Sequence, residues 1–375
     1  MRSAKLLIIA PAVLLSPLAV NAMPSMNIYG FVDIGLEQYS ETGINGGADI
    51  FQGGDTPNGN STDKEFALTN NVQSRIGVKG EEQLDSGWKG SYRMEFRANV
   101  LDDGGQALRT RLGWLALSKD EHNITVGSQW SPLFGYSGWN ANRGESHGYA
   151  SYYYILDQLP GSMAYGYRND SSISYTYGKG PYDDSPFTAT VSVQVGDDNR
   201  ADATGQLYND SGITGVQAGM AATFGATTLN MAMGKSIVKE SDAAKAASVD
   251  VTAPSVLMLG GKFKASDKLD FGLAYRSSDR DTGNNSGRYS ISGSVQYQLT
   301  DAIALHAGMA TGEDEDDTQR QLDSDIYGQI LHQLSDSRHV RFEFERVNYG
   351  QSVVAGSEQD LGHAHVMQFS MRQSF

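Results

Sequence analysis

Basic side chains recur at spacings of two or four residues in three consecutive segments of the chain, namely Arg75 and Lys79, then Lys89, Arg93 and Arg97, then Arg109 and Arg111. Such spacing places the side chains of each segment on one face of a β-strand. Cations gathered on one wall attract anions and orient the dipoles of water and solutes in the adjoining space. The competing interpretation is that they are only solvated, or paired with the nearby carboxylates Glu81, Glu82 and Glu95.

The residues between these cations are largely apolar or aromatic. In the stretch GWKGSYRMEFRANV, the side chains at alternate positions are Trp88, Tyr92, Met94 and Phe96. Strict alternation is the pattern of a β-strand with two chemically different faces. The apolar face could pack on the core of a soluble protein or face lipid, and this stretch alone agrees with both arrangements.

The same alternation recurs to the end of the chain. Clear examples are FTATVSVQV, KLDFGLAYR, RYSISGSVQYQ and HVRFEFER, whereas DIYGQILHQL divides its apolar residues between both faces. We count roughly sixteen segments of about ten residues, the length of a tilted strand that crosses a membrane. No comparable helical period is present in the sequence. The pattern predicts an all-β transmembrane antiparallel barrel.

The links between these segments are alternately long and short. Short turns include EQLDSG, SKDEH, ASDK and LSDSR, and long links include residues 41–71 and 131–165. Outer-membrane barrels have short turns on the periplasmic side and long loops outside, whereas a soluble sandwich has no reason for this segregation. No change of composition suggests a second domain.

The N-terminus, MRSAKLLIIAPAVLLSPLAVNAM, has a basic start, a short apolar stretch and small residues before position 23. It predicts a cleavable export signal over residues 1–22 and a single barrel domain over residues 23–375. Loss of Arg2 and Lys5 leaves 27 basic residues against 44 acidic ones, a formal charge of −17. This charge argues against a nucleic-acid partner, and the absence of cysteine excludes disulfides.

Other chemistry-bearing groups give weaker signals. The acidic run Glu313–Asp317 could bind divalent cations that bridge to lipopolysaccharide, but a solvated loop tip explains it as well. His363 and His365 are too few ligands for a metal site. The sequence contains no G-x-S-x-G or H-E-x-x-H motif, so we expect no catalytic residues, no cofactor and no enzyme activity. A barrel that is an adhesin or structural element stays an alternative to a channel.

Several stretches in order resemble the Gram-negative general (trimeric) porins: MNIYGFVDIGLE, SRIGVKGEEQLDSGWKGSYRMEF, RTRLGWLALS, ITVGSQWSPLFGY, RNDSSISYTY and the terminal Phe375. The resemblance implies a barrel of about 16 strands in the bacterial outer membrane. It also implies a homotrimer that passes ions and small hydrophilic solutes passively, with the long fifth link folded into the lumen. Phe375, which ends the last strand, is the expected assembly signal.

The resemblance also implies a constriction in which the basic wall faces acidic residues of the inward loop. We expect Arg75, Arg93 and Arg111 nearest mid-height, with Glu145 and Asp157 as acidic candidates. The loop lacks the Pro-Glu-Phe-Gly-Gly motif of many relatives. Arg372 is expected on the lumenal face near the periplasmic end, and Trp88 and Trp114 in the outer aromatic girdles.

Ion preference stays open at this point. The basic wall suits anions, whereas the charge of −17 attracts cations to the pore mouths. The alternative to a general porin is a substrate-selective porin with a binding site for a small anionic or sugar solute.

Overall fold

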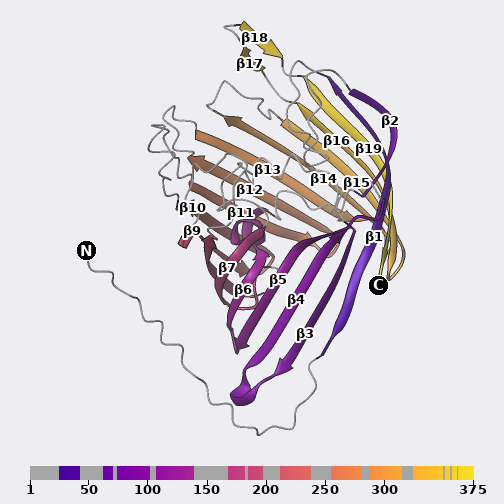
Figure 1. Cartoon of the computed structure of the whole chain (residues 1–375). Helices are drawn as coiled ribbons and strands as arrows, with labels where there is room; N and C mark the ends of the chain where they lie inside the picture. The colour runs from indigo at the N-terminus through magenta and orange to yellow at the C-terminus, as the bar shows by residue number, and fades with distance from the viewer. Residues whose placement is uncertain are drawn as a thin grey trace, which may run out of the picture.

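The computed structural model describes residues 25–42, 62–70, 74–101, 107–138, 168–181, 185–196, 212–237, 255–279, 287–314, 324–348, 351–354, 357–360 and 362–375. Their strands wind into a tilted, closed antiparallel barrel (Figure 1). Within these residues no helix has both the length and the apolar character needed to cross a membrane. The expected signal, residues 1–22, lies outside the described residues.

The barrel has sixteen antiparallel strands. In chain order they are β1 (Asn27–Thr42), β2 (Thr62–Thr69) with β3 (Arg75–Gln83), β4 (Lys89–Ala98), β5 (Leu108–Lys119), β6 (His122–Trp130), β7 (Arg168–Tyr177), β8 (Phe187–Gly196), β9 (Gly212–Phe224), β10 (Thr227–Ser236), β11 (Ser255–Ser266), β12 (Leu269–Asp279), β13 (Gly287–Gln298), β14 (Ile303–Asp314), β15 (Ser324–Ser335), β16 (Arg338–Asn348) and β19 (His363–Ser374). The short strands β17 (Gln351–Val354) and β18 (Ser357–Asp360) form a separate hairpin.

Two of these segments form a single barrel strand. Both β2 and β3 pair with β1, β3 along its first half and β2 along its second. Ser74 fills the interruption, because its hydroxyl accepts from the Asp33 N–H (2.9 Å) and donates to the Asp33 carbonyl (3.2 Å). The sequence pattern assigned residues 41–71 to a loop, so that interpretation is wrong for β2, whose polar composition concealed a strand.

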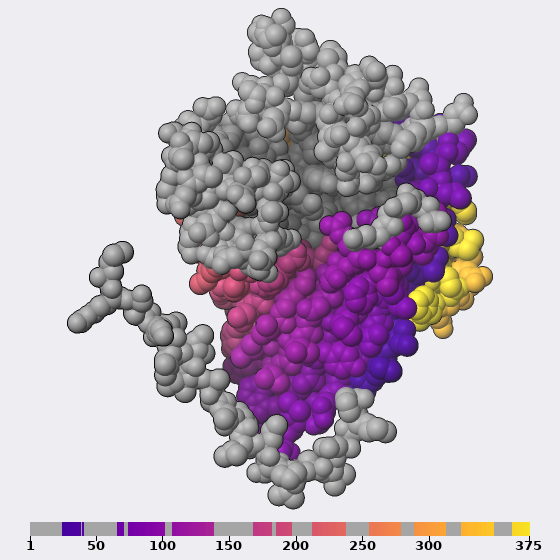
Figure 2. All heavy atoms as spheres, viewed as in Figure 1, coloured from indigo at the N-terminus to yellow at the C-terminus, as the bar shows by residue number. Residues whose placement is uncertain are grey.

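The barrel closes where the first and last strands meet. β1 pairs with β19 from Phe31 opposite Ser374 to Thr42 opposite His363. In Figure 2, the indigo surface of β1 lies between the purple surface of β3–β5 and the yellow surface of the last residues. Closure leaves no unpaired sheet edge, which is the condition for a sheet to cross a bilayer.

Side-chain exposure follows the alternation that the sequence predicts. Leu115 on β5 is 68% exposed on the outer face, whereas Glu95 on β4 is 1% exposed on the inner one. A charge on the lipid face would cost about 2–4 kcal/mol at mid-bilayer. The apolar residues of GWKGSYRMEFRANV therefore face outward, and its charges face the lumen.

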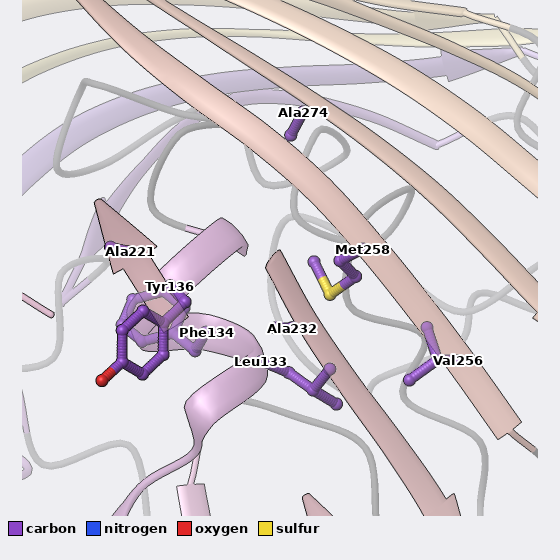
Figure 3. Packing of buried hydrophobic residues seen from close by; sticks show 8 residues of the cluster. All are labelled: Leu133, Phe134, Tyr136, Ala221, Ala232, Val256, Met258 and Ala274. Carbon is purple, nitrogen blue, oxygen red and sulfur yellow. The ribbon is translucent and has the colours of Figure 1, made fainter. Parts of the chain in front are cut away.

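The link after β6 enters the barrel. Its described part ends with the π-helical turn Phe134–Gly138, which is buried. Leu133, Phe134 and Tyr136 pack against small and apolar inner-face residues of the far wall, namely Ala221, Ala232, Val256, Met258 and Ala274 (Figure 3). The expectation of a loop folded into the lumen is therefore met for residues 131–138.

Candidate pore constriction

A β-bulge shapes the lumenal wall between β4 and β5. The register shifts so that Glu95 lies opposite Leu112 while Phe96 lies opposite Thr110, which leaves Arg111 as the extra residue. A bulge lets two successive residues approach the same face of a sheet. Arg111 and Leu112 are accordingly both buried, and Arg111 reaches the carboxylate of Glu95.

Glu95 is the centre of a charged cluster on this wall. Its Oε1 accepts from Arg111 Nε at 2.9 Å and lies 3.8 Å from Arg75 Nη1, and its Oε2 accepts from Arg93 Nη2 at 2.8 Å. Three cations around one carboxylate leave a local excess of positive charge. The exposed fractions of the side chains are 6% for Arg111, 19% for Arg75 and 30% for Arg93, so Arg93 is the most accessible of the three to solute.

The structure thus combines the two interpretations of these arginines. Arg75, Arg93 and Arg111 share one lumenal wall, and Glu95, one of the carboxylates of the competing interpretation, pairs with all three. Arg97 lies between Arg75 and Arg109 in the same row of paired residues. Lys79 extends the basic wall from this row toward the short turn that follows β3. It is exposed, and its Nζ lies 5.3 Å from the centroid of the Tyr29 ring.

A second charged cluster spans the seam between β1 and β19. Asp33 accepts from Arg341 Nη2 at 2.8 Å and from Arg372 Nε at 2.7 Å. Arg341 also lies 3.6 Å from Glu343. The Arg341 side chain is 0% exposed and that of Arg372 is 7% exposed. Inward parity on the first and last strands was the available signal for this cluster, but the sequence did not reveal its pairings.

Phe31 connects the two clusters. The guanidinium carbon of Arg75 lies 4.4 Å from the centroid of its ring, and that of Arg372 lies 4.1 Å from it. Arg372 does stand near the end of β19, as expected. However, strand tilt and the Phe31 contact bring it beside the basic wall, so it is not a remote charge.

The sequence analysis expected Trp114 in the outer aromatic girdles, and this prediction is wrong. The register places Trp114 opposite Arg93 and Gly127, on the lumenal side, while Leu115 and Leu117 face outward. The bulge at Arg111 reverses the parity of the rest of β5, because a shift of one residue exchanges the two faces of a strand. Trp88, before β4, is exposed.

The inward loop begins beside the charged cluster. The guanidinium carbons of Arg111 and Arg168 lie 5.9 Å and 5.4 Å from the Trp130 ring, and that ring stacks on Phe134 at 4.9 Å. Glu145 and Asp157, the candidates for the opposing acidic side, lie outside the described residues. For the other acidic candidates, Glu313 and Asp314 end β14, and residues 315–317 are likewise outside.

Further round the barrel, the lumenal wall of β7–β9 buries mainly neutral groups. On β7–β9, Ser174 donates to Ser192 at 2.9 Å, and Thr176 and Thr190 share a hydrogen bond of 2.9 Å. The loop rests on this wall, because the Tyr136 hydroxyl lies 2.8 Å from Thr190 Oγ1 and 3.2 Å from Thr188 Oγ1. Burial raises the pKa of Tyr136 above its ordinary value, so this contact stays uncharged.

The candidate metal ligands do not converge. His363 and His365 stack with centroids 6.5 Å apart. In the described part of the chain, no group of three His, Cys, Asp or Glu side chains could enclose a metal ion.

Comparison with known proteins gives one family. A family model described as Gram-negative porin matches residues 9–351. No curated protein sequence matches the chain significantly.

Solved structures share the fold at low sequence identity. The anion-selective porin of Comamonas acidovorans is 15% identical with a TM-score of 0.64, over 94% of this chain and 100% of that chain. The outer-membrane channel DcaP of Acinetobacter baumannii is 14% identical with a TM-score of 0.64, over 94% and 97%. The trimer form of OmpT of Vibrio cholerae is 16% identical with a TM-score of 0.61, over 94% and 99%.

Proposed function

The chain belongs to the Gram-negative porin family, and on that premise we propose that its basic wall forms the charge-selective constriction of the pore. The protein is an outer-membrane channel for passive diffusion of solutes. The proposed constriction comprises Arg75, Lys79, Arg93, Arg97, Arg109 and Arg111, faced by acidic loop residues that include Glu145 and Asp157. Its field sorts solutes by charge and dipole.

One observation carries this proposal, namely the cluster of three guanidiniums around the single carboxylate of Glu95. Arg75 and Arg93 keep part of their surface accessible, so their charge acts on a passing ion. The loop root beside Arg111 supports a narrow passage at this level. Because cations exceed carboxylates here, we infer that small anions are favoured at the constriction despite the negative charge of the whole chain.

The test replaces Arg93 with Ala and records single-channel currents in planar bilayers with a salt gradient. A unit charge at about 4 Å is worth about 1 kcal/mol in bulk water, which corresponds to about a fivefold change in the anion-to-cation permeability ratio. We expect the ratio to fall by about this factor and the conductance of bulky solutes to rise.

Lys89→Ala is the matched control. Lys89 belongs to the same strand and the same lumenal parity, but it stands at the short-turn end and pairs with exposed Glu81 at 3.2 Å. Both variants remove one positive charge. Equal shifts in the two variants would show that only net charge matters and would remove Arg93 from the constriction.

A second candidate function, a substrate-selective porin for a small anion, has the same support. The cluster offers several guanidinium donors, the groups that bind carboxylates and phosphates best. Block of the current by micromolar phosphate or a small dicarboxylate would favour it over a general porin. The family and fold are those of a channel, and we infer no enzyme activity.

We further propose a homotrimer whose assembly depends on Phe375. The N–H and carbonyl of Phe375 both bond to Gly30, each at 3.1 Å, and its ring is exposed on the outer face. Deleting Phe375 removes two hydrogen bonds that close the barrel. Unboiled gels of outer membranes should then show several-fold less trimer, while Phe375→Tyr assembles normally. Full assembly of the deletion variant would show that this residue is dispensable.

Export completes the proposal. We infer that residues 1–22 are removed and that the mature, single-domain barrel runs from residue 23 to residue 375. The basic start and small residues before position 23 support cleavage after Ala22. An N-terminus other than Met23 in the mature protein would contradict it.

A further inference from the structure

Tyr29 lies flat across the neighbouring strand of the lumenal wall. It pairs with Gly77 on β3, and Gly77 pairs with Glu95 on β4, so the three residues form one row across three strands. A Cβ atom at position 77 would lie 2.4 Å from Cζ of the Tyr29 ring. Only glycine therefore leaves room for the ring to cross β3 and reach the charged cluster.

The Tyr29 hydroxyl joins Arg93 to Glu95. Arg93 Nε donates to this hydroxyl at 2.5 Å, and the hydroxyl donates to Glu95 Oε2 at 2.9 Å. Arg93 Nη2 donates to the same carboxylate oxygen at 2.8 Å. The guanidinium carbon of Arg93 also lies 4.9 Å from the Tyr29 ring centroid. Two hydrogen bonds and the ring face together hold this guanidinium against the wall.

The cluster has a fixed end and an accessible end. Arg111 is buried and holds Oε1 of Glu95, so the carboxylate does not depend on Arg93 for its position. Arg93 is the most exposed arginine of the three. Without the Tyr29 hydroxyl, only the contact with Glu95 and the face of the ring would fix its long side chain.

We propose that Tyr29, seated on Gly77, is a positioning residue that holds the Arg93 guanidinium close to Glu95 and thereby sets the ion preference and open width of the pore. This inference rests on the proposed role of Arg93 in the constriction. Held in this way, the charge of Arg93 is partly cancelled by Glu95. Once released, it moves into the lumen, where it narrows the passage and attracts anions more strongly.

The test uses Tyr29→Phe, which removes the hydroxyl and keeps the ring, and Gly77→Ala, which displaces the ring without changing any charge. One hydrogen bond of ordinary net strength shifts a conformational equilibrium by about two- to tenfold. Both variants should raise the anion-to-cation permeability ratio by about twofold. They should also lower single-channel conductance and increase open-channel current noise.

The chain offers a matched control on the opposite face. Tyr92 lies across Gly80 in the same way, with its ring 2.7 Å from where a Gly80 Cβ would stand, but on the lipid side of β4. Tyr92→Phe makes the same chemical change two strands away, on β4. It should leave the permeability ratio, conductance and noise unchanged.

The double variant Tyr29→Phe/Arg93→Ala separates positioning from other effects. If Tyr29 acts through Arg93, its substitution changes nothing further once Arg93 is absent. An equal shift in both backgrounds would overturn the proposal, as would wild-type behaviour of Tyr29→Phe while Arg93→Ala shifts the ratio. If Arg93→Ala itself has no effect, the proposed constriction fails and this inference fails with it.

Discussion

The inner walls formed by β3–β5 and by β7–β9 arise from the same alternation of side chains, yet they bury their polar groups by different means. On β3–β5, Glu95 is surrounded by the guanidiniums of Arg75, Arg93 and Arg111. On β7–β9, hydroxyl and amide groups bond to one another, as Ser174 does to Ser192. Neutral hydrogen bonds leave no net charge on the wall, whereas three cations around one anion leave an excess of positive charge.

The difference shows how a barrel can acquire a field across its lumen. Neutral hydroxyls contribute only dipoles, so β7–β9 gives the inward loop a surface to rest on, through Tyr136 and its two threonine partners. The excess cations of β3–β5 supply the field from one side. Function therefore depends on where charges do not cancel. Substitutions on β3–β5 should change ion preference, whereas substitutions on β7–β9 should change only stability.

Glu95→Gln should give the largest effect. It keeps the shape of the side chain but removes the negative charge from three guanidiniums. Because breaking a buried ion pair costs about 3–5 kcal/mol, we expect the protein to unfold at a lower temperature in gel-shift assays. In salt gradients the anion-to-cation permeability ratio should rise by about fivefold, the equivalent of about 1 kcal/mol. An unchanged ratio would show that Glu95 does not limit the charge of this wall.

Asp33→Asn should sharpen the comparison by testing the second charged cluster, at the seam. Asp33 pairs with Arg341 and Arg372, whose side chains are almost completely buried. We expect a loss of stability similar to that of Glu95→Gln, about 3 kcal/mol, measured by the same gel shift. Because these cations are shielded from the lumen, the shift in permeability ratio should be less than half as large. A larger shift in the permeability ratio than that of Glu95→Gln would show that the constriction lies at the seam and not at Glu95.

Thr190→Val should have the smallest effect on ion preference. It removes a hydroxyl that contacts Tyr136 and Thr176 and keeps the shape of the side chain. The lost hydrogen bonds cost about 1 kcal/mol of stability, visible as a small decrease in unfolding temperature. The reversal potential in a salt gradient should stay that of the wild type. A shift comparable to that of Arg93→Ala would refute the division into charged and neutral walls.

Much of the fold was predictable because a bilayer imposes a strict rule on each strand. Alternation identified the inward face of Arg75 and Arg93, and link lengths identified the two ends of the barrel. Both signals are local, since a lipid-facing charge is penalised wherever it occurs. The sequence did not reveal the polar strand β2, because alternation is weak there.

The details of the site were less predictable, for two physical reasons. A single extra residue at Arg111 reverses strand parity, so Trp114 was placed on the wrong face. The alternation of residue types does not reveal such a bulge, because it inserts only one extra residue into one strand. Moreover, Asp33 and Arg372 are 339 residues apart, and a local pattern contains no information about which distant strand supplies a partner.

The seam between β1 and β19 has a consequence for how this chain folds. Bringing together residues this far apart in sequence has a high cost in loop-closure entropy, and topologies dominated by distant contacts fold slowly. Arg341, Glu343 and Arg372 of the second charged cluster come from the last two barrel strands, while Asp33 comes from the first. Asp33 therefore gains its ion-pair partners only when the last strands pair with the first. The pore gains its full charge pattern in the same step in which the sheet becomes a tube.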